Sequence, residues 1–119
     1  MTIKEGFIRI IQTRKRAKEE KDYIIFAGFD MVDIVRVLSK NYIETKVLLE
    51  NATKEEIGVA IDALEDLVRF FCKEQAQELV SIFKQKVIVF PDIQEYCDCD
   101  YIEQIEMAES YLEELQQNK

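Results

Sequence analysis

The chain has 119 residues, of which 48% are hydrophobic and 34% charged, and its formal net charge at pH 7 is −8. This length fits a single domain over residues 1–119, and this apolar content excludes a disordered chain. The sequence contains no His, which removes the commonest general base, the commonest metal ligand and every Ser–His or Cys–His pair, so we expect neither an enzyme nor a cofactor.

Turn-forming residues are scarce, with only three Gly and one Pro in the chain. Sandwiches and barrels need many turns, so this scarcity favours a few long elements. We expect an all-α fold of five or six helices in antiparallel pairs, arranged either as a bundle or as a short α-solenoid of the HEAT type.

Neither a membrane span nor an export signal is visible. A span needs roughly 20 consecutive apolar residues, and no apolar run approaches that length. The first ten residues, MTIKEGFIRI, lack the continuous apolar segment of a signal peptide. Three Cys without such a signal indicate reduced thiols, so we expect a cytoplasmic protein.

The first predicted helix covers about residues 3–15. Thr2 and Glu5 have the spacing of a capping box, and apolar residues then recur at helical spacing, at Ile3, Phe7, Ile10 and Ile11. Its end is basic, with Arg14, Lys15, Arg16 and Lys18. A nucleic-acid patch is one reading of this run. Because acidic residues follow at once, we favour a solvated helix end.

A second helix is predicted from a cap at Asp22 to about residue 40. Residues 23–29 also have the pattern of a buried strand, and a break at Gly28 with Asp30 as a new cap is a third possibility. A third helix is predicted over Tyr42–Glu50, with Ile43, Val47 and Leu48 facing inward. Asn51 is then expected to adopt the left-handed conformation that ends many helices.

The clearest helix signal starts at Thr53, which forms a capping box with Glu56. We expect one helix over residues 54–72. Its apolar face should lead the core, with Ile57, Ile61, Leu64, Val68 and Phe71.

Three further helical segments are predicted. A helix over residues 73–85 is followed by residues 87–90, which are either its last turn or extended, because Pro91 must end the element. A short helix is expected over residues 92–97. Asp100 should cap a final helix whose inward residues are Ile102, Ile105, Ala108, Leu112 and Leu115.

The formal charge of the chain is concentrated in its last quarter. Residues 92–119 hold nine acidic residues and one basic residue, Lys119, whereas residues 1–91 hold fifteen of each sign. We therefore expect a carboxylate face that no other part of the chain neutralises. Such a face repels nucleic acid and acidic membranes and attracts a basic protein.

Carboxylates and thiols crowd together at Cys97, Asp98, Cys99 and Asp100, which invites a metal or redox hypothesis. Zinc sites use four ligands, usually in two separated Cys or His pairs, and the only other thiol is Cys72. Di-iron helices and glycosidase-like acid pairs need inward or facing carboxylates. We favour the simpler interpretation, in which the two Asp are helix caps and no metal binds.

The remaining hypothesis is a protein-binding surface. Tyrosine is favoured in protein interfaces as an anchor, and two Tyr lie among the acids. The candidate partner-binding residues are Tyr96, Asp98, Asp100, Tyr101, Glu103, Glu106 and Glu109. The alternative is that these acids only keep the protein soluble.

In size, charge and helical make-up the chain resembles the small, acidic, all-helical immunity proteins of bacterial polymorphic and contact-dependent toxin systems. The stretches EYCDCDYIEQIEMAESYLEE and IGVAIDALEDLVRFF carry this resemblance. It implies a partner that is a basic toxin domain, such as a nuclease, covered by acidic and aromatic side chains. The alternative function is a structural or adaptor module that forms homodimers through an exposed apolar stripe.

Overall fold

The computed structural model describes residues 2–20 and 31–117. Within these ranges the regular elements are all helices, and there is no β-strand. The all-α prediction is therefore confirmed. The helices are α1 (Ile3–Glu20), α2 (Met31–Leu38), α3 (Tyr42–Glu50), α4 (Lys54–Ile61), α5 (Leu64–Leu67), α6 (Lys73–Val89) and α7 (Tyr101–Gln117). Two short 3-10 helices, η1 (Val68–Phe70) and η2 (Ile93–Tyr96), complete the described elements.

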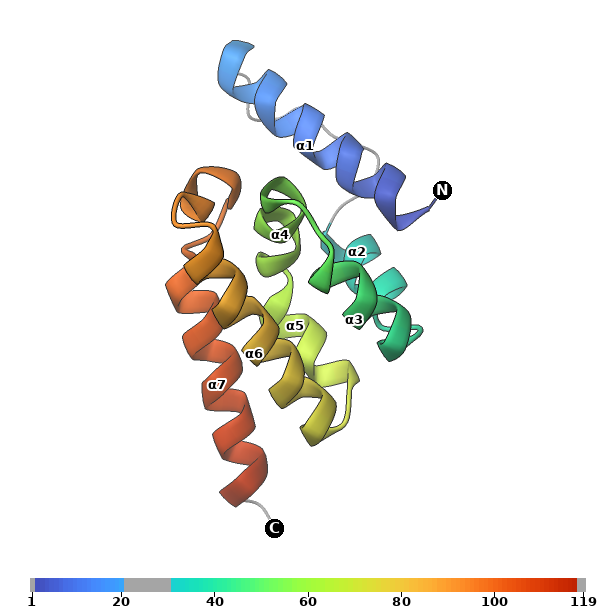
Figure 1. The fold of residues 1–119 in the computed structure, drawn as a ribbon, viewed down its shortest axis with the longest axis vertical. Helices are drawn as coiled ribbons and strands as arrows, with labels where there is room; N and C mark the ends of the chain where they lie inside the picture. Colours follow the sequence, from blue (N-terminus) through green and yellow to red (C-terminus); the bar gives the residue numbers. More distant parts are fainter. Residues whose placement is uncertain (1, 21–30, 118–119) are drawn as a thin grey trace.

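The helices form an elongated molecule with principal extents of 50 × 28 × 25 Å. The long helices α6 and α7 run antiparallel along one side, α4 and α5 follow each other through the middle, and α2 and α3 lie on the other side (Figure 1). Helix α1 crosses one end of the molecule, against α4 and α2 (Figure 1). The central position of α4 brings it into contact with both ends of the chain.

The core is built around apolar residues of the helical segments that follow Thr53. Ile57, Ile61, Leu64 and Val68 are fully buried, as predicted, while Phe71 is only partly buried. Burying each aliphatic side chain of this size stabilises the fold by about 1.5–3 kcal/mol. Helices from the rest of the chain close around them with further fully buried side chains, among them Phe7, Ile34, Leu49, Leu79 and Phe83.

The prediction of one helix over residues 54–72 is wrong. Helix α4 ends at Ile61, and the chain turns through Asp62 and Ala63 before α5 begins at Leu64. Ala63 has φ −102° and ψ 0°, which lies outside the helical region. The apolar spacing continues across the turn because both segments bury the same face, so periodicity alone does not reveal the break.

Helix α3 has the predicted bounds but a different orientation. Thr45 and Leu49 are buried, whereas Ile43 and Val47, which were predicted to face inward, are 67% and 55% exposed. Asn51 has φ −105°, so it is not left-handed. It ends the helix instead through its side-chain amide, which donates to the carbonyl of Val47 at 2.8 Å.

The other boundaries follow local signals. Residues 87–89 continue α6, and Phe90 is the C-terminal cap just before Pro91. The predicted helix over 92–97 is the 3-10 helix η2. Helix α1 extends beyond residue 15 to Glu20, and the choice between helix and strand for residues 23–29 lies outside the described residues. None of the described helices has the length and apolar content needed to cross a membrane.

The capping box of α4 is also an anchor for α1. The Thr53 hydroxyl accepts from the Glu56 N–H at 3.2 Å, and the Glu56 carboxylate accepts from the Thr53 N–H at 3.0 Å. Lys4 of α1 reaches the other carboxylate oxygen at 2.9 Å. Burial opposes ionisation of Glu56, but the bonds from Thr53 and Lys4 outweigh it and hold its pKa below the ordinary value of 4.5.

Replacing Glu56→Gln should therefore destabilise the protein in a pH-dependent way. A carboxylate whose pKa is lowered by folding stabilises the folded state above its ordinary pKa of 4.5, and this contribution is lost as the pH falls through the lower folded-state pKa. We expect the variant to unfold with about 1 kcal/mol less free energy at pH 7. In urea titrations this difference should shrink at pH 3, and an equal difference at both pH values would contradict the assignment.

Candidate functional site

The acidic segment 92–100 is pressed against helix α4 at Gly58. A Cβ atom added to Gly58 would lie only 2.5 Å from both the Cβ and the carbonyl oxygen of Tyr96. Real Cβ atoms do not approach backbone so closely, so only glycine permits this contact. Gly58 therefore determines how near η2 and its acidic neighbours lie to the core.

Asp62, in the turn between α4 and α5, binds the same segment. Its side chain is only 2% exposed, and its two oxygens accept the backbone N–H groups of Asp98 at 2.9 Å and Cys99 at 3.0 Å. Arg14 of α1 completes the site, with Nη2 at 2.7 Å from Asp62 and Nη1 at 2.8 Å from the carbonyl of Tyr96. A buried carboxylate needs such partners, because an unpaired buried charge is strongly destabilising.

Two lysines contact the first residues of segment 92–100. Lys54 lies 3.1 Å from the Asp92 carboxylate and 5.2 Å from the centre of the Tyr96 ring. The hydrogen bond from Lys54 lowers the pKa of Asp92 below its ordinary value. Lys18 of α1 donates to the carbonyl of Glu95 at 3.1 Å. Segment 92–100 is thus fixed by cations from two helices.

Both thiols in this segment have a raised pKa. Burial raises the pKa of Cys97 to about 12, and the nearby Asp62 carboxylate adds to the effect. The thiol of Cys97 donates to the carbonyl of Ile93 at 3.3 Å. Since the thiolate is the form that reacts and binds metals, Cys97 is unsuited to either role. Within residues 2–20 and 31–117, no three His, Cys, Asp or Glu side chains form a group able to hold a metal ion.

Asp100 starts the final helix as predicted. One of its carboxylate oxygens accepts from the N–H of Ile102 at 2.9 Å, which satisfies a free donor at the beginning of α7. Gln94 joins the segment to the helix, because its side-chain amide donates to the carbonyl of Cys99 and accepts from the N–H of Tyr101. The direction of α7 is therefore set by the segment that precedes it.

Helix α7 buries one face and exposes the other. The buried residues are Gln104, Ile105, Ala108 and Leu112. Ile102 was predicted to face inward, but its side chain is 51% exposed, so that prediction is wrong. Met107 is also exposed, at 38%. The outward face thus carries two apolar side chains among its acids.

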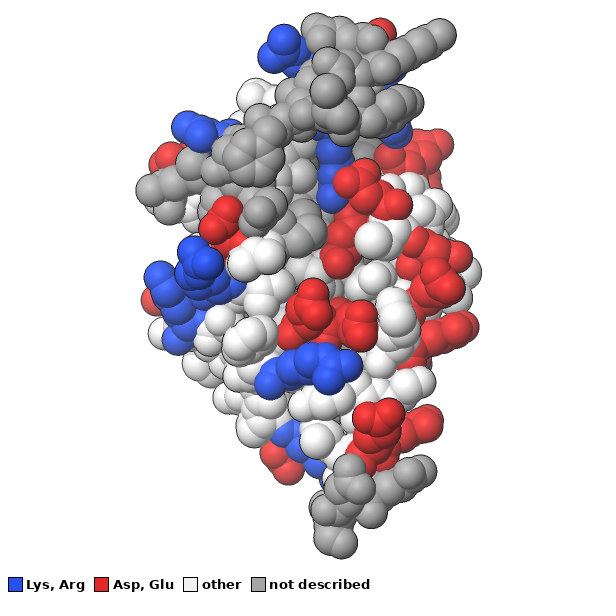
Figure 2. Space-filling view, turned by 180° about the vertical axis from the view of Figure 1, so that it is seen from behind, with Lys and Arg blue, Asp and Glu red and all other residues white. Residues whose placement is uncertain are grey.

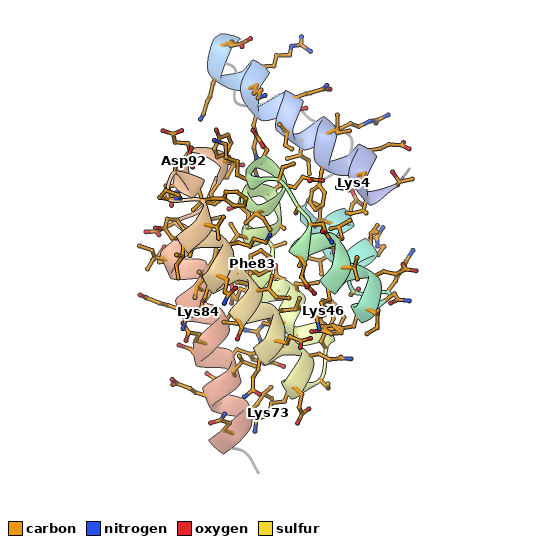
Figure 3. The ribbon with its side chains drawn as sticks, viewed as in Figure 1. Lys4, Lys46, Lys73, Phe83, Lys84 and Asp92 are labelled. Carbon is orange, nitrogen blue, oxygen red and sulfur yellow. The ribbon has the colours of Figure 1, made fainter. Side chains whose placement is uncertain are left out.

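Three of the acids in the last quarter of the chain are paired within the molecule. Asp92 pairs with Lys54, Asp98 lies 3.3 Å from Arg14, and Glu109 lies 3.4 Å from Lys84. Lys84 lies on the side of α6 that faces α7, and Asp92 is the first residue of segment 92–100 (Figure 3). The expectation that no other part of the chain neutralises this charge is therefore wrong for these residues.

Of the six other acids in the last quarter, Glu95 lies in η2, Asp100 caps α7, and four lie on the outward face of α7. These four exposed carboxylates have no ion pair within the described ranges 2–20 and 31–117: Glu103, Glu106, Glu113 and Glu114. Acidic side chains run down the edge of the molecule that carries α7 (Figure 2). We call the exposed residues Ile102, Glu103, Glu106, Met107, Glu113 and Glu114 the α7 face.

The predicted site residues separate into two groups. Glu103 and Glu106 belong to the α7 face, whereas Asp98, Asp100 and Glu109 are occupied in ion pairs or helix capping. The two tyrosines are only partly exposed: Tyr96 stacks beside Lys54, and Tyr101 packs against the core. Their rings are therefore less available to a partner than the sequence suggests.

Ile102 and Met107 are surface residues that the sequence patterns did not single out. The signal was present, because Ile102 precedes Glu106 by four residues and Glu113 by eleven, which places it on the acidic side of a helix with 3.6 residues per turn. The roles of Arg14 and Asp62 had no such signal, since their partners lie far along the chain.

Comparison with known proteins adds nothing to this picture: no protein-family model matches the chain, and neither a curated protein nor a solved structure is found to be similar to it.

Proposed function

We propose that this is a non-catalytic protein-binding inhibitor, an immunity protein that neutralises a basic, nuclease-like toxin domain through the α7 face. The proposal rests on the mixture of exposed apolar and acidic side chains on that face. Ile102 and Met107 are exposed among four carboxylates that have no ion pair within the described residues. Protein-binding surfaces combine apolar side chains with polar and charged neighbours, and the α7 face offers both kinds.

The two kinds of side chain would have different roles in binding. Unpaired carboxylates on one face raise the rate at which a basic partner associates, and they repel acidic partners such as nucleic acid and anionic membranes. Apolar side chains removed from water in the contact slow dissociation. A bacterial cytoplasm is the compartment in which such an inhibitor would meet a toxin that has entered the cell.

The rigid mounting of α7 supports the same proposal. Asp100 caps the helix, Gln94 ties its first residue to segment 92–100, and Asp62 ties that segment to α4. A surface held in one geometry binds with less loss of conformational entropy than a mobile one. The α7 face would thus be presented ready for contact.

The test is co-expression with a basic toxin domain, chosen among the products of the neighbouring genes. In the variant Glu103→Lys/Glu106→Lys we expect affinity for that protein to fall about tenfold or more and protection of the cells to be lost. Binding of the parent protein should weaken as salt is raised. Isothermal titration calorimetry at two salt concentrations gives the affinities, and colony counts give the protection.

A matched control is Glu19→Lys/Glu44→Lys, which makes the same charge change at exposed residues of α1 and α3. This control should bind and protect as the parent does. The variants Ile102→Ala and Met107→Ala should raise the dissociation rate with little effect on association. If the α7 reversals leave both binding and protection unchanged, the proposal is wrong.

A further inference from the structure

Helix α1 is basic, whereas the rest of the chain is strongly acidic. Residues 3–20 contain six basic and three acidic residues, a net charge of +3, and all other residues together contain ten basic and twenty-one acidic residues, a net charge of −11. The helix crosses one end of the molecule, against α4 and α2 (Figure 1). It therefore packs on a molecule whose remaining net charge is opposite to its own.

The inner face of α1 combines cations with apolar side chains. Spacings of three and four residues place on this face Lys4, Phe7, Ile11, Arg14 and Lys18. Among residues 3–19, only Gly6, Phe7 and Ile10 are buried, whereas α4 buries all of residues 56–61. A helix with so few buried apolar side chains separates from the fold at a lower free energy than the core helices do.

The groups that bind these cations are three carboxylates and two backbone carbonyls. They are the carboxylates of Glu56, Asp62 and Asp98 and the carbonyls of Glu95 and Tyr96. From Lys4 to Lys18 the contacts extend along about 21 Å of helix. We call these acceptors, with the surface that Phe7 and Ile10 cover, the α1-binding surface. It complements a helix that has cations and apolar side chains on one face.

The α1-binding surface is held in place by contacts that do not involve α1. The Glu56 carboxylate belongs to the capping box of α4. Asp62 accepts from two backbone N–H groups of segment 92–100, and Gly58 allows the Tyr96 carbonyl to lie close to α4. These contacts remain available when α1 is displaced, with water in place of its cations. A binding surface that is already formed loses little conformational entropy when a ligand binds.

We propose that the α1-binding surface is a second partner-binding site, which binds a basic amphipathic helix of another protein in place of α1. Helix α1 itself shows the chemistry of the ligand, because its cations and apolar side chains occupy this surface. An amphipathic helix that lies on a complementary surface is a common mode of peptide recognition. The net charge of −11 outside α1 attracts a basic segment and repels nucleic acid. In the free protein α1 is thus an autoinhibitory segment.

Occupation of the surface by α1 lowers the apparent affinity for a partner helix. The apparent Kd equals the intrinsic Kd divided by the fraction of molecules in which α1 is displaced. A change that weakens the docking of α1 in its own chain, without altering the surface, should therefore tighten the binding of a separate helix. The surface shares no residue with the α7 face, so this inference does not depend on the function proposed above.

The first test uses the intact chain and a fluorescent synthetic peptide with the sequence of residues 2–20. Lys4→Gln/Lys18→Gln in the chain removes two cation contacts of α1 but leaves the α1-binding surface unchanged. Because exposed contacts of this kind are individually weak, the variant should still fold, and circular dichroism verifies this. Fluorescence anisotropy should show that the variant binds the peptide about threefold to tenfold more tightly than the parent chain does.

A third replacement identifies the place of binding. When Glu56→Gln is added to Lys4→Gln/Lys18→Gln, the Lys4 of the peptide loses its acceptor, whereas residue 4 of the chain has no ion pair left to lose. The affinity for the peptide should therefore fall again, by about threefold. Reversal of the α7 face by Glu103→Lys/Glu106→Lys should change the affinity by less than about twofold at about 0.15 M salt, because screening limits the effect of charges outside the contact.

The peptide also provides a control with unchanged charge. Phe7→Ser in the peptide removes the side chain that is fully buried in the docked helix and keeps every cation. The affinity should fall about tenfold or more, because the apolar contact is lost. A peptide that adhered to the acidic chain only through its net charge would bind as before.

Three outcomes would overturn the inference. They are equal affinities of the parent chain and Lys4→Gln/Lys18→Gln for the peptide, equal binding of the parent and Phe7→Ser peptides, and loss of binding when the α7 face is reversed. The last outcome would place the peptide on the α7 face and leave the function proposed above intact.

Discussion

Asp62→Ala should lower the free energy of unfolding by about 3–5 kcal/mol, the largest effect expected of any single replacement described above. The Asp62 side chain is 2% exposed and accepts from Arg14 and from the N–H groups of Asp98 and Cys99. Removing the carboxylate leaves two backbone donors without their acceptor and takes from Arg14 its shortest ion pair.

Urea unfolding at pH 7 measures this effect. The matched control is Asp66→Ala, which removes an exposed carboxylate from the next helix, and it should change stability by no more than about 0.5 kcal/mol. Adding Arg14→Met to Asp62→Ala should cost less than the sum of the two single changes, because both replacements remove the same ion pair between these side chains. Equal effects of Asp62→Ala and Asp66→Ala would show that the carboxylate of Asp62 does not hold segment 92–100.

Gly58→Val should destabilise the protein by about 3 kcal/mol through overpacking. Even the Cβ atom of Gly58→Ala would lie 2.5 Å from the Tyr96 backbone oxygen, which no change of side-chain rotamer can relieve. Alanine gains about 1 kcal/mol of helix propensity over glycine, yet we expect a net loss of about 1–2 kcal/mol, because the steric cost is larger. In both variants η2 must move away from α4.

Two measurements distinguish this displacement from a general loss of stability. The melting temperature should fall by about 4–8 °C for each kcal/mol lost. In addition, Cys97, which is half-buried within the segment, should react faster with a thiol reagent under native conditions. Ser110→Ala at an exposed helical position is the control for propensity and should not be destabilising. A stable Gly58→Val variant with an unchanged Cys97 would refute the close contact.

Signals that act over a few residues predicted the local structure well. Thr53 and Glu56 form the predicted capping box, and Asp100 caps α7. The break after Ile61 could not be predicted in this way, because it is stabilised by contacts between Asp62 and backbone groups 36 and 37 residues further along the chain. Apolar spacing measures which side of a segment is buried, and that side is the same before and after the turn.

The orientation of α3 shows a second limit of sequence patterns. Its sequence, YIETKVLLE, places apolar residues around most of the helix, so the pattern does not single out one inward face. Packing selects Leu49 and Thr45, whose hydroxyl donates to the carbonyl of Leu38 at 2.5 Å. Ile43 and Val47 are left on the surface as a consequence.

For the candidate site, composition located the acidic region but not the residues that remain available. Counting charges cannot reveal that Arg14 reaches Asp98, which is 84 positions away in the sequence, or that Lys84 reaches Glu109. Such pairs depend on which helices become neighbours. After these pairs are formed, four of the remaining carboxylates lie together on the α7 face.

The contacts of Arg14 also determine the order in which the fold can be completed. Arg14 lies in the first helix, while the Tyr96 carbonyl that it binds and the backbone groups that Asp62 accepts lie at positions 96, 98 and 99. A chain leaves the ribosome from its N-terminus, and bringing residues so far apart together costs more entropy than forming a local turn. During synthesis Asp62 therefore emerges without its backbone partners, and the site closes only after the last quarter of the chain has been made.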